Sequence, residues 1–134
     1  MSEKIKVLLV EPNKYPKMIE IEDTLEAMQK VVDGGIEEYM PFDDDVAIIC
    51  NDESKYNGMF PNRAIYSDDK EMQDIIFGQF FVCYAPIESE KFMSLPDDLA
   101  KKYEEKFKYP ERFFKKDNEI VAVPFKPKSK EQER

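Results

Sequence analysis

The chain has 134 residues, of which 20 are basic and 29 are acidic, and its formal net charge is -9. Apolar residues make up 42% of the sequence and aromatic residues 13%, which is enough for the hydrophobic core of one domain. The sequence contains no histidine. This absence excludes nucleophiles activated by histidine, histidine general bases and the usual zinc sites.

The charge is unevenly distributed along the chain. Residues 1–100 carry 9 basic and 22 acidic side chains, whereas residues 101–134 carry 11 basic and 7 acidic ones. Because the larger part is acidic, we expect no direct binding of nucleic acid. No apolar run is long enough to cross a bilayer, and no signal-peptide pattern precedes the first strand. Cys50 and Cys83 lie inside apolar runs and are expected to be buried, reduced thiols, so we predict a cytoplasmic protein.

The first half of the chain predicts one helix among several strands. The helix has Asp23 or Thr24 as its N-cap, an apolar stripe at helical spacing, and Gly34-Gly35 as its stop signal. The strands are short apolar or alternating runs bounded by turn residues. They cover residues 4–10, 17–21, 36–42 and 46–50.

The second half predicts a second helix and a charged C-terminal tail. Residues 67–74 indicate a helical turn, and the helix is expected to start with Ser94 as its cap and to end at Tyr109-Pro110. The longest strand contains Gly78, where we expect a bulge or the tight approach of another segment. Residues 126–134 have too little apolar surface to fold. The expected strands cover residues 63–66, 75–84 and 120–125.

Together these elements predict one α+β domain over residues 1–125, followed by a disordered charged tail over residues 126–134. The expected architecture is a single mixed, largely antiparallel sheet of about five to six strands with two main helices. No internal repeat and no linker divides the chain.

Acidic and polar loops do not form a recognisable catalytic or metal-binding motif. Asp43-Asp44-Asp45 is followed by apolar residues, and residues 51–58 place a lysine where a calcium loop needs an oxygen ligand. No phosphate-binding glycine motif is present. We therefore expect no metal site, no cofactor and no enzymatic activity; metal-assisted catalysis through carboxylates is the remaining enzymatic alternative.

The segment from residue 51 to residue 63 is the candidate ligand-binding site. It combines three asparagines, a glycine and the one arginine of the first hundred residues, and a guanidinium suits a carboxylate or phosphate. In the alternative interpretation, the arginine pairs with one of the surrounding acids and the asparagines cap turns. The candidate residues are Asn51, Asn57, Gly58, Asn62 and Arg63.

Several of these motifs, taken together, resemble a known family. They are the run from Asp44 to Asn51, the pairs Asn57-Gly58 and Asn62-Arg63, the run from Asp74 to Cys83, and a helix from Leu95 that ends in Tyr-Pro-Glu-Arg-Phe. The chain resembles, over about residues 4–114, the small bacterial and phage proteins grouped as domain of unknown function 3846. The resemblance implies a setting in phages or conjugative elements and gives no established activity.

Two functions therefore stand as expectations. The first is an uncharacterised accessory binding protein, typical of phage or conjugative elements, that acts non-enzymatically through a protein partner. The second is a small-ligand module that binds an anionic metabolite or nucleotide at the loop from Asn51 to Arg63.

Overall fold

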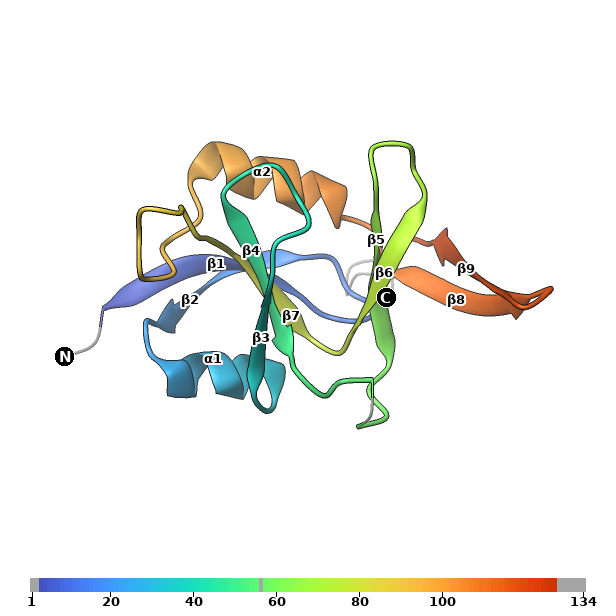
Figure 1. Ribbon diagram of the computed structural model, residues 1–134, viewed down its shortest axis with the longest axis horizontal. Coiled ribbons are helices and arrows are strands. Elements are labelled where there is room, and N and C mark those ends of the chain that lie inside the picture. Colours follow the sequence, from blue (N-terminus) through green and yellow to red (C-terminus); the bar gives the residue numbers. More distant parts are fainter. Residues whose placement is uncertain (1–2, 56, 128–134) are drawn as a thin grey trace, which may run out of the picture.

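The structure, a computed structural model, describes residues 3–55 and 57–127 (Figure 1). The described residues form strands and helices in the order β1 (Lys4–Val10), β2 (Lys17–Glu22), α1 (Leu25–Val32), β3 (Ile36–Tyr39), β4 (Val46–Asn51), β5 (Pro61–Tyr66), β6 (Met72–Phe77), β7 (Phe80–Tyr84), α2 (Asp97–Lys106), β8 (Glu111–Lys116) and β9 (Glu119–Pro124). No helix within residues 3–55 and 57–127 has the length and apolar character needed to span a membrane.

A five-stranded sheet with the order β2-β1-β7-β4-β3 forms the centre of the molecule. All of its strand pairs are antiparallel. The inner strands β4 and β7 are almost entirely buried, as expected for strands covered on both faces. Because both faces of β4 and β7 are covered, their sequences are apolar at nearly every position and do not alternate with polar residues.

The two helices lie on opposite faces of this sheet, α2 above it and α1 below it in Figure 1. Side chains alternate along each strand, so Val7 and Phe81 join the core under α1, whereas Leu8 and Phe80 join the core under α2. The second core also contains side chains of the β5–β6 pair. The molecule therefore has three layers.

Local signals explain where α1 begins and ends. The Thr24 side-chain oxygen accepts a hydrogen bond from the Ala27 amide at 3.1 Å, as an N-cap does. After Val32 the chain turns through Asp33, whose φ of 61° is left-handed, and Gly34 follows. The predicted cap and stop of this helix are confirmed.

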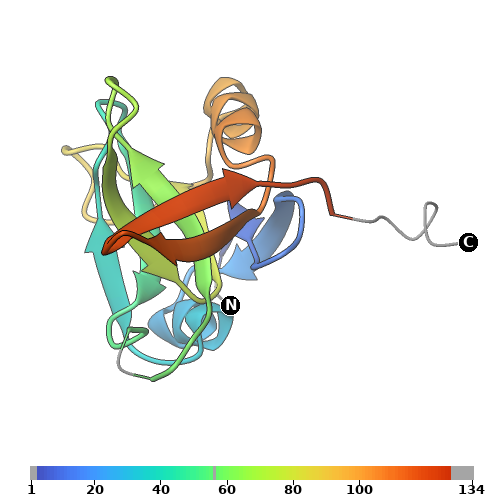
Figure 2. The same cartoon turned by 90° about the vertical axis from the view of Figure 1, so that its right-hand side faces the viewer.

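Two further hairpins stand outside the central sheet: β5 pairs with β6, and β8 pairs with β9. The β8–β9 hairpin forms the end of the molecule opposite the N-terminus (Figure 1), and in the view of Figure 2 it lies across the front. Its turn is formed by Asp117 and Asn118, both with positive φ, as a two-residue hairpin turn requires.

The predicted α+β class and the two helices are confirmed, but the expected single sheet is wrong. Residues 75–84 do not form one bulged strand. The chain breaks at Gly78, whose φ is 80°, and the two halves become β6 and β7 in different sheets. Every named strand pair is antiparallel, so the expected mixture of directions is also absent from the described residues.

Two local predictions in the second half of the chain are also wrong, and one strand was not predicted. Residues 67–74 form a turn and the start of β6 instead of a helical turn, because Ser67 accepts the Lys70 amide and the hairpin reverses there. Ser94 does not cap α2, since its hydroxyl accepts the Lys6 amide at 2.9 Å. Strand β8 was missed; the predicted strand 120–125 is present as β9. Most of the predicted tail, residues 128–134, lies outside the described residues.

Candidate functional site

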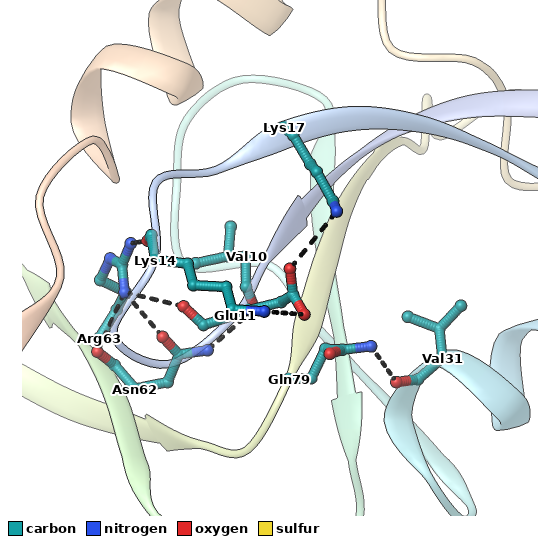
Figure 3. Close-up of polar contacts among 8 residues, drawn as sticks. All are labelled: Val10, Glu11, Lys14, Lys17, Val31, Asn62, Arg63 and Gln79. Atoms are coloured by element: carbon teal, nitrogen blue, oxygen red, sulfur yellow. Dashed lines mark hydrogen bonds and ion pairs between the residues drawn. The ribbon is translucent and has the colours of Figure 1, made fainter. Parts of the chain in front are cut away.

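Arg63, the central residue of the predicted ligand site, is buried, and only 1% of its surface is exposed. Its guanidinium donates to the backbone carbonyls of Phe107 (Nε to O, 3.0 Å) and Lys14 (Nη2 to O, 2.7 Å). A third hydrogen bond, from Nη1 to the Asn62 side-chain oxygen, is 2.8 Å long. Figure 3 shows the guanidinium directed toward the loop after β1. Arg63 thus joins β5 to that loop and to the end of α2.

Asn62, its neighbour, extends the same network to two other segments. The side-chain amide donates to the carbonyl of Val10 at 2.9 Å, and its oxygen accepts from Arg63 (Figure 3). The same amide also donates to the carbonyl of Gly78 at 2.8 Å. Because Asn62 is 1% exposed, these bonds replace water completely. The pair Asn62-Arg63 holds the ends of β1, β6 and α2 around β5.

The charge of Arg63 is stabilised without a direct ion pair. Burial lowers the pKa of Arg63 to about 10, and the negative charge of Glu111 acts in the opposite direction. None of the ion pairs within residues 3–55 and 57–127 involves Arg63. The guanidinium is therefore still a cation at neutral pH, solvated by carbonyl dipoles.

Asn51 has a separate structural role at the end of α1. Its side-chain amide donates to the carbonyls of Val32 at 3.1 Å and Asp33 at 3.0 Å, and its oxygen accepts the Glu53 amide at 2.7 Å. The last carbonyls of a helix lack partners within the helix. Asn51, the last residue of β4, supplies hydrogen-bond donors to these carbonyls and thereby caps the C-terminal end of α1.

Asn57 and Gly58 line an open groove of about 810 Å³ between the end of α1 and the turns around residues 60 and 78. Both residues are exposed, and Gly58 has a φ of 72°. Lys30 is the cationic side chain of this groove, and the exposed ring of Phe60 forms part of its wall. This is the part of the predicted site that remains accessible to a ligand.

The five predicted site residues therefore do not form one surface site. The structure brings Asn62 and Arg63 together, places Asn51 at the end of α1, and leaves Asn57 and Gly58 in the groove. Arg63 does not offer its guanidinium to a carboxylate or phosphate at the surface, because backbone carbonyls surround it. No acid forms an ion pair with Arg63 in the described part of the chain, so the alternative of pairing with an acid is wrong as well. The expected role of an asparagine in capping a turn is confirmed for Asn51, whose side-chain oxygen accepts the Glu53 amide.

The β8–β9 hairpin carries a surface that the sequence interpretation missed. Cross-strand partners share a face, so Phe114 and Val121 lie side by side, as do Arg112 and Val123. On this outer face Phe114 is 54% exposed and Val123 is 45% exposed. The turn pair Asp117-Asn118 between two runs of alternating or apolar residues was the available sequence signal.

Glu111 anchors the base of the hairpin to β5. One carboxylate oxygen accepts the Ala64 amide at 2.8 Å, and the other accepts the Tyr66 hydroxyl at 2.8 Å. Burial raises the pKa of Tyr66, and the hydrogen bond to Glu111 raises it further. The hydroxyl therefore stays protonated and donates to the carboxylate.

The triple aspartate of the sequence has a structural role at its middle residue. Asp44 accepts hydrogen bonds from the ammonium of Lys102 at 2.6 Å and from the hydroxyl of Tyr103 at 2.8 Å, which together lower its pKa. The loop before β4 is thereby joined to α2. No group of three or more potential metal ligands occurs in the described part of the chain.

Comparison with known proteins identifies a family over most of this structure. The sequence model described as "Domain of unknown function (DUF3846)" matches residues 5–108, which is more than half of the chain. The chain belongs to the DUF3846 family. No curated protein and no solved structure matches it.

The part of this DUF3846 protein that matches the family comprises the central sheet, both helices and the β5–β6 pair. It includes Asn51, Asn62 and Arg63 with most of their partners. The β8–β9 hairpin begins at Glu111, beyond the matched residues. The buried polar network therefore belongs to the family region, and the exposed apolar hairpin does not.

Proposed function

We propose that this DUF3846 protein is a non-enzymatic accessory binding protein, of the kind typical of phage or conjugative elements, and that its protein partner docks on the β8–β9 hairpin. The supporting observation is the exposed apolar face of that hairpin, formed by Phe114, Val121 and Val123. Apolar side chains on the face of a sheet are normally buried against a second sheet or another element that packs on that face. Here β8 contacts β5 at the base of the hairpin, and the face that carries Phe114 meets solvent.

Two physical considerations favour a hairpin that binds a partner over a hairpin without a binding role. A two-stranded sheet gains little stability in water unless something packs on it. A single exposed apolar side chain is common on protein surfaces, but a contiguous group of them promotes aggregation. Such a patch on a folded protein therefore usually marks an interaction site. An acidic chain with a net charge of -9 stays soluble enough to present such a patch.

A comparison of two variants tests this proposal. Tagged wild-type protein, the hairpin variant Phe114→Asp/Val121→Asp and the control variant Leu25→Asp/Ile87→Asp are used to recover proteins from host lysate. The control residues are exposed hydrophobic side chains outside the hairpin, so the change in chemistry is matched. We expect one protein to be recovered with wild type and control and lost with the hairpin variant, and the purified pair to reproduce this difference in calorimetry. Equal recovery with all three proteins would contradict the proposal.

The alternative function is a small-ligand module in the groove that contains Asn57 and Gly58. It is favoured by the volume of that groove, about 810 Å³, and by the ammonium of Lys30, which would bind an anionic metabolite or nucleotide. A thermal-shift screen with nucleotides tests it. The shift of any hit is expected to disappear in Lys30→Ala and to persist in Lys17→Ala, and a screen without hits would refute this alternative.

A further inference from the structure

The register of the β8–β9 hairpin determines which of its backbone groups are available to a partner. The Phe125 amide donates to the Pro110 carbonyl at 2.9 Å, so these two residues form a hydrogen-bonded pair. Hydrogen-bonded and non-hydrogen-bonded pairs alternate along an antiparallel ladder. Consequently Arg112, Phe114 and Lys116 direct their amides toward β9, and Phe113 and Lys115 direct theirs away from it.

The two outer edges of the hairpin are not equivalent. No strand of the described chain pairs with the outer edge of either β8 or β9. On β9 the outward position Pro124 lacks an amide hydrogen, which is a common way to block strand addition at an edge. On β8 the amides of Phe113 and Lys115 remain as donors, and both carbonyls remain as acceptors. The outward amides of β9 are those of Ile120 and Ala122 and are followed by the proline, whereas every outward position of β8 keeps its amide hydrogen. The edge of β8 is therefore the better of the two for adding a strand.

The side chains along β8 are basic on both sides of an aromatic pair. Arg112, Lys115 and Lys116 flank Phe113 and Phe114, and no ion pair within the described residues involves these three cations. The acidic residue of the strand, Glu111, directs its carboxylate to β5. An incoming chain would meet positive charge at both ends of an apolar centre.

We propose that the partner docks as an extended acidic segment that adds as a third, antiparallel strand to the edge of β8; this inference rests on the function proposed above. Cross-strand pairing favours opposite charges and places aliphatic side chains beside aromatic ones. Because the added strand is antiparallel, its residues from N- to C-terminus face β8 from Lys116 back to Arg112. Acidic residues would face the two lysines, apolar residues would face the two phenylalanines, and a further acidic residue would face Arg112. Main-chain hydrogen bonds would provide affinity, and these side chains would provide selectivity.

Peptide titration of ¹⁵N-labelled protein tests the chemistry directly. The test peptide has blocked ends and the core Glu-Glu-Val-Val-Glu; the comparison peptides have the core Lys-Lys-Val-Val-Lys or the acidic core with N-methylated backbone amides. We expect the acidic peptide to shift the Phe113 and Lys115 amide signals and to slow their hydrogen exchange. The basic and N-methylated peptides should leave both amides unchanged. Raising the salt concentration should weaken the binding of the acidic peptide, because the charges are exposed.

A matched pair of protein variants separates the backbone contribution from charge. Lys115→Thr and Lys115→Pro both remove the ammonium group, but only proline also removes the outward amide hydrogen. We expect Lys115→Pro to bind the acidic peptide about tenfold more weakly than Lys115→Thr, the effect of one lost interstrand hydrogen bond. The unchanged amide spectrum of the central sheet verifies that both variants are folded.

Several outcomes would overturn strand addition by an acidic segment. Equal binding of the N-methylated peptide would show that no main-chain ladder forms, and equal binding of the basic peptide would show that charge is irrelevant. Stronger shifts of the β8 amides with a DNA duplex would make this strand a nucleic-acid contact. A dimer in sedimentation analysis that Phe114→Asp dissociates would mean that a second copy occupies the edge. If no peptide binds while the lysate partner still depends on the hairpin, the inference fails and the proposed function stands.

Discussion

Replacement of Arg63 by alanine removes a side chain that donates five hydrogen bonds, more than any other among the described residues, from a site that is 1% exposed. If the guanidinium served a ligand, the unliganded variant would fold with nearly normal stability. If it serves the fold, the loop after β1 and the end of α2 lose their common donor. The two interpretations therefore differ in the stability of the protein without ligand.

The expected loss of stability follows from the acceptors that alanine would leave behind. The carbonyls of Phe107 and Lys14 and the side-chain oxygen of Asn62 each lie within 3.0 Å of a guanidinium nitrogen. An unsatisfied buried acceptor costs about 1–3 kcal/mol, and water entering the space would reduce this toward the lower value. With the lost packing of the aliphatic stem, we expect a total loss of about 4 kcal/mol.

Urea unfolding monitored by far-ultraviolet circular dichroism measures this loss. With an m-value of about 2 kcal/mol per molar urea, the midpoint of Arg63→Ala should fall by about 2 M. Arg112→Ala is the control, because Arg112 is exposed, and its midpoint should stay within about 0.3 M of wild type. A stable Arg63→Ala protein, with a midpoint like that of the control, would refute the structural role of the guanidinium.

Three further predictions follow from individual contacts. Asn51→Ala should lose about 2 kcal/mol in urea unfolding, because the last carbonyls of α1 lose their donor, while exposed Asn57→Ala should change by less than about 0.5 kcal/mol. Glu111→Ala should accelerate hydrogen exchange at the Ala64 amide about tenfold, because that amide loses its carboxylate acceptor; an unchanged rate would mean that the hairpin is held by other contacts. Burial raises the pKa of the Cys83 thiol to about 12 from an ordinary value of 9.0, so above pH 9 the unfolded chain releases a proton that the folded chain keeps. This thiol should therefore leave stability unchanged below pH 9 and lower it by about 1.4 kcal/mol per pH unit between pH 9 and 12. The Cys50 thiol, whose pKa burial also raises to about 12, adds its own fall, so Cys83→Ala should reduce the slope in alkaline unfolding experiments by about 1.4 kcal/mol per pH unit without abolishing it.

The parts of the fold that were predicted correctly are those in which local chemistry decides the structure. The first helix has a capping hydroxyl at Thr24 and a left-handed exit at Asp33, and both depend on residues within the helix or next to it. The strand from Lys4 to Val10 and its hairpin partner pair directly along the sequence. No distant contact is needed to choose these elements.

The long apolar run around Gly78 shows why the sheet arrangement was not predictable in the same way. A bulge in one strand and a turn between two strands both use a glycine with positive φ. In the structure Gly78 has a φ of 80°, and a Cβ there would lie 2.6 Å from the Met59 sulfur. The second strand then pairs with β1 and β4, which are far away in the sequence. The choice depends on tertiary contacts that hydrophobic periodicity does not contain.

The candidate site was predicted less well because residue types do not reveal where a polar side chain is satisfied. The sequence around Arg63 contains many carboxylates, so a surface ion pair and a bound anion were the two evident interpretations. The structure uses neither, since the acceptors are mainly main-chain carbonyls that are present at every position. When a side chain donates to main-chain carbonyls, the residue types of its partners do not matter, so the sequence cannot reveal which residues they are.

This distinction also bears on where the function of the protein should be sought. A polar side chain that is fully bonded inside the fold cannot bind a ligand without breaking those bonds, and Asn51, Asn62 and Arg63 are all in that position. The apolar face of β8–β9 is in the opposite situation, because burial on a partner would remove Phe114 and Val123 from water without breaking any internal bond. Binding there costs no internal hydrogen bond, and this asymmetry makes the hairpin the stronger candidate for a functional surface.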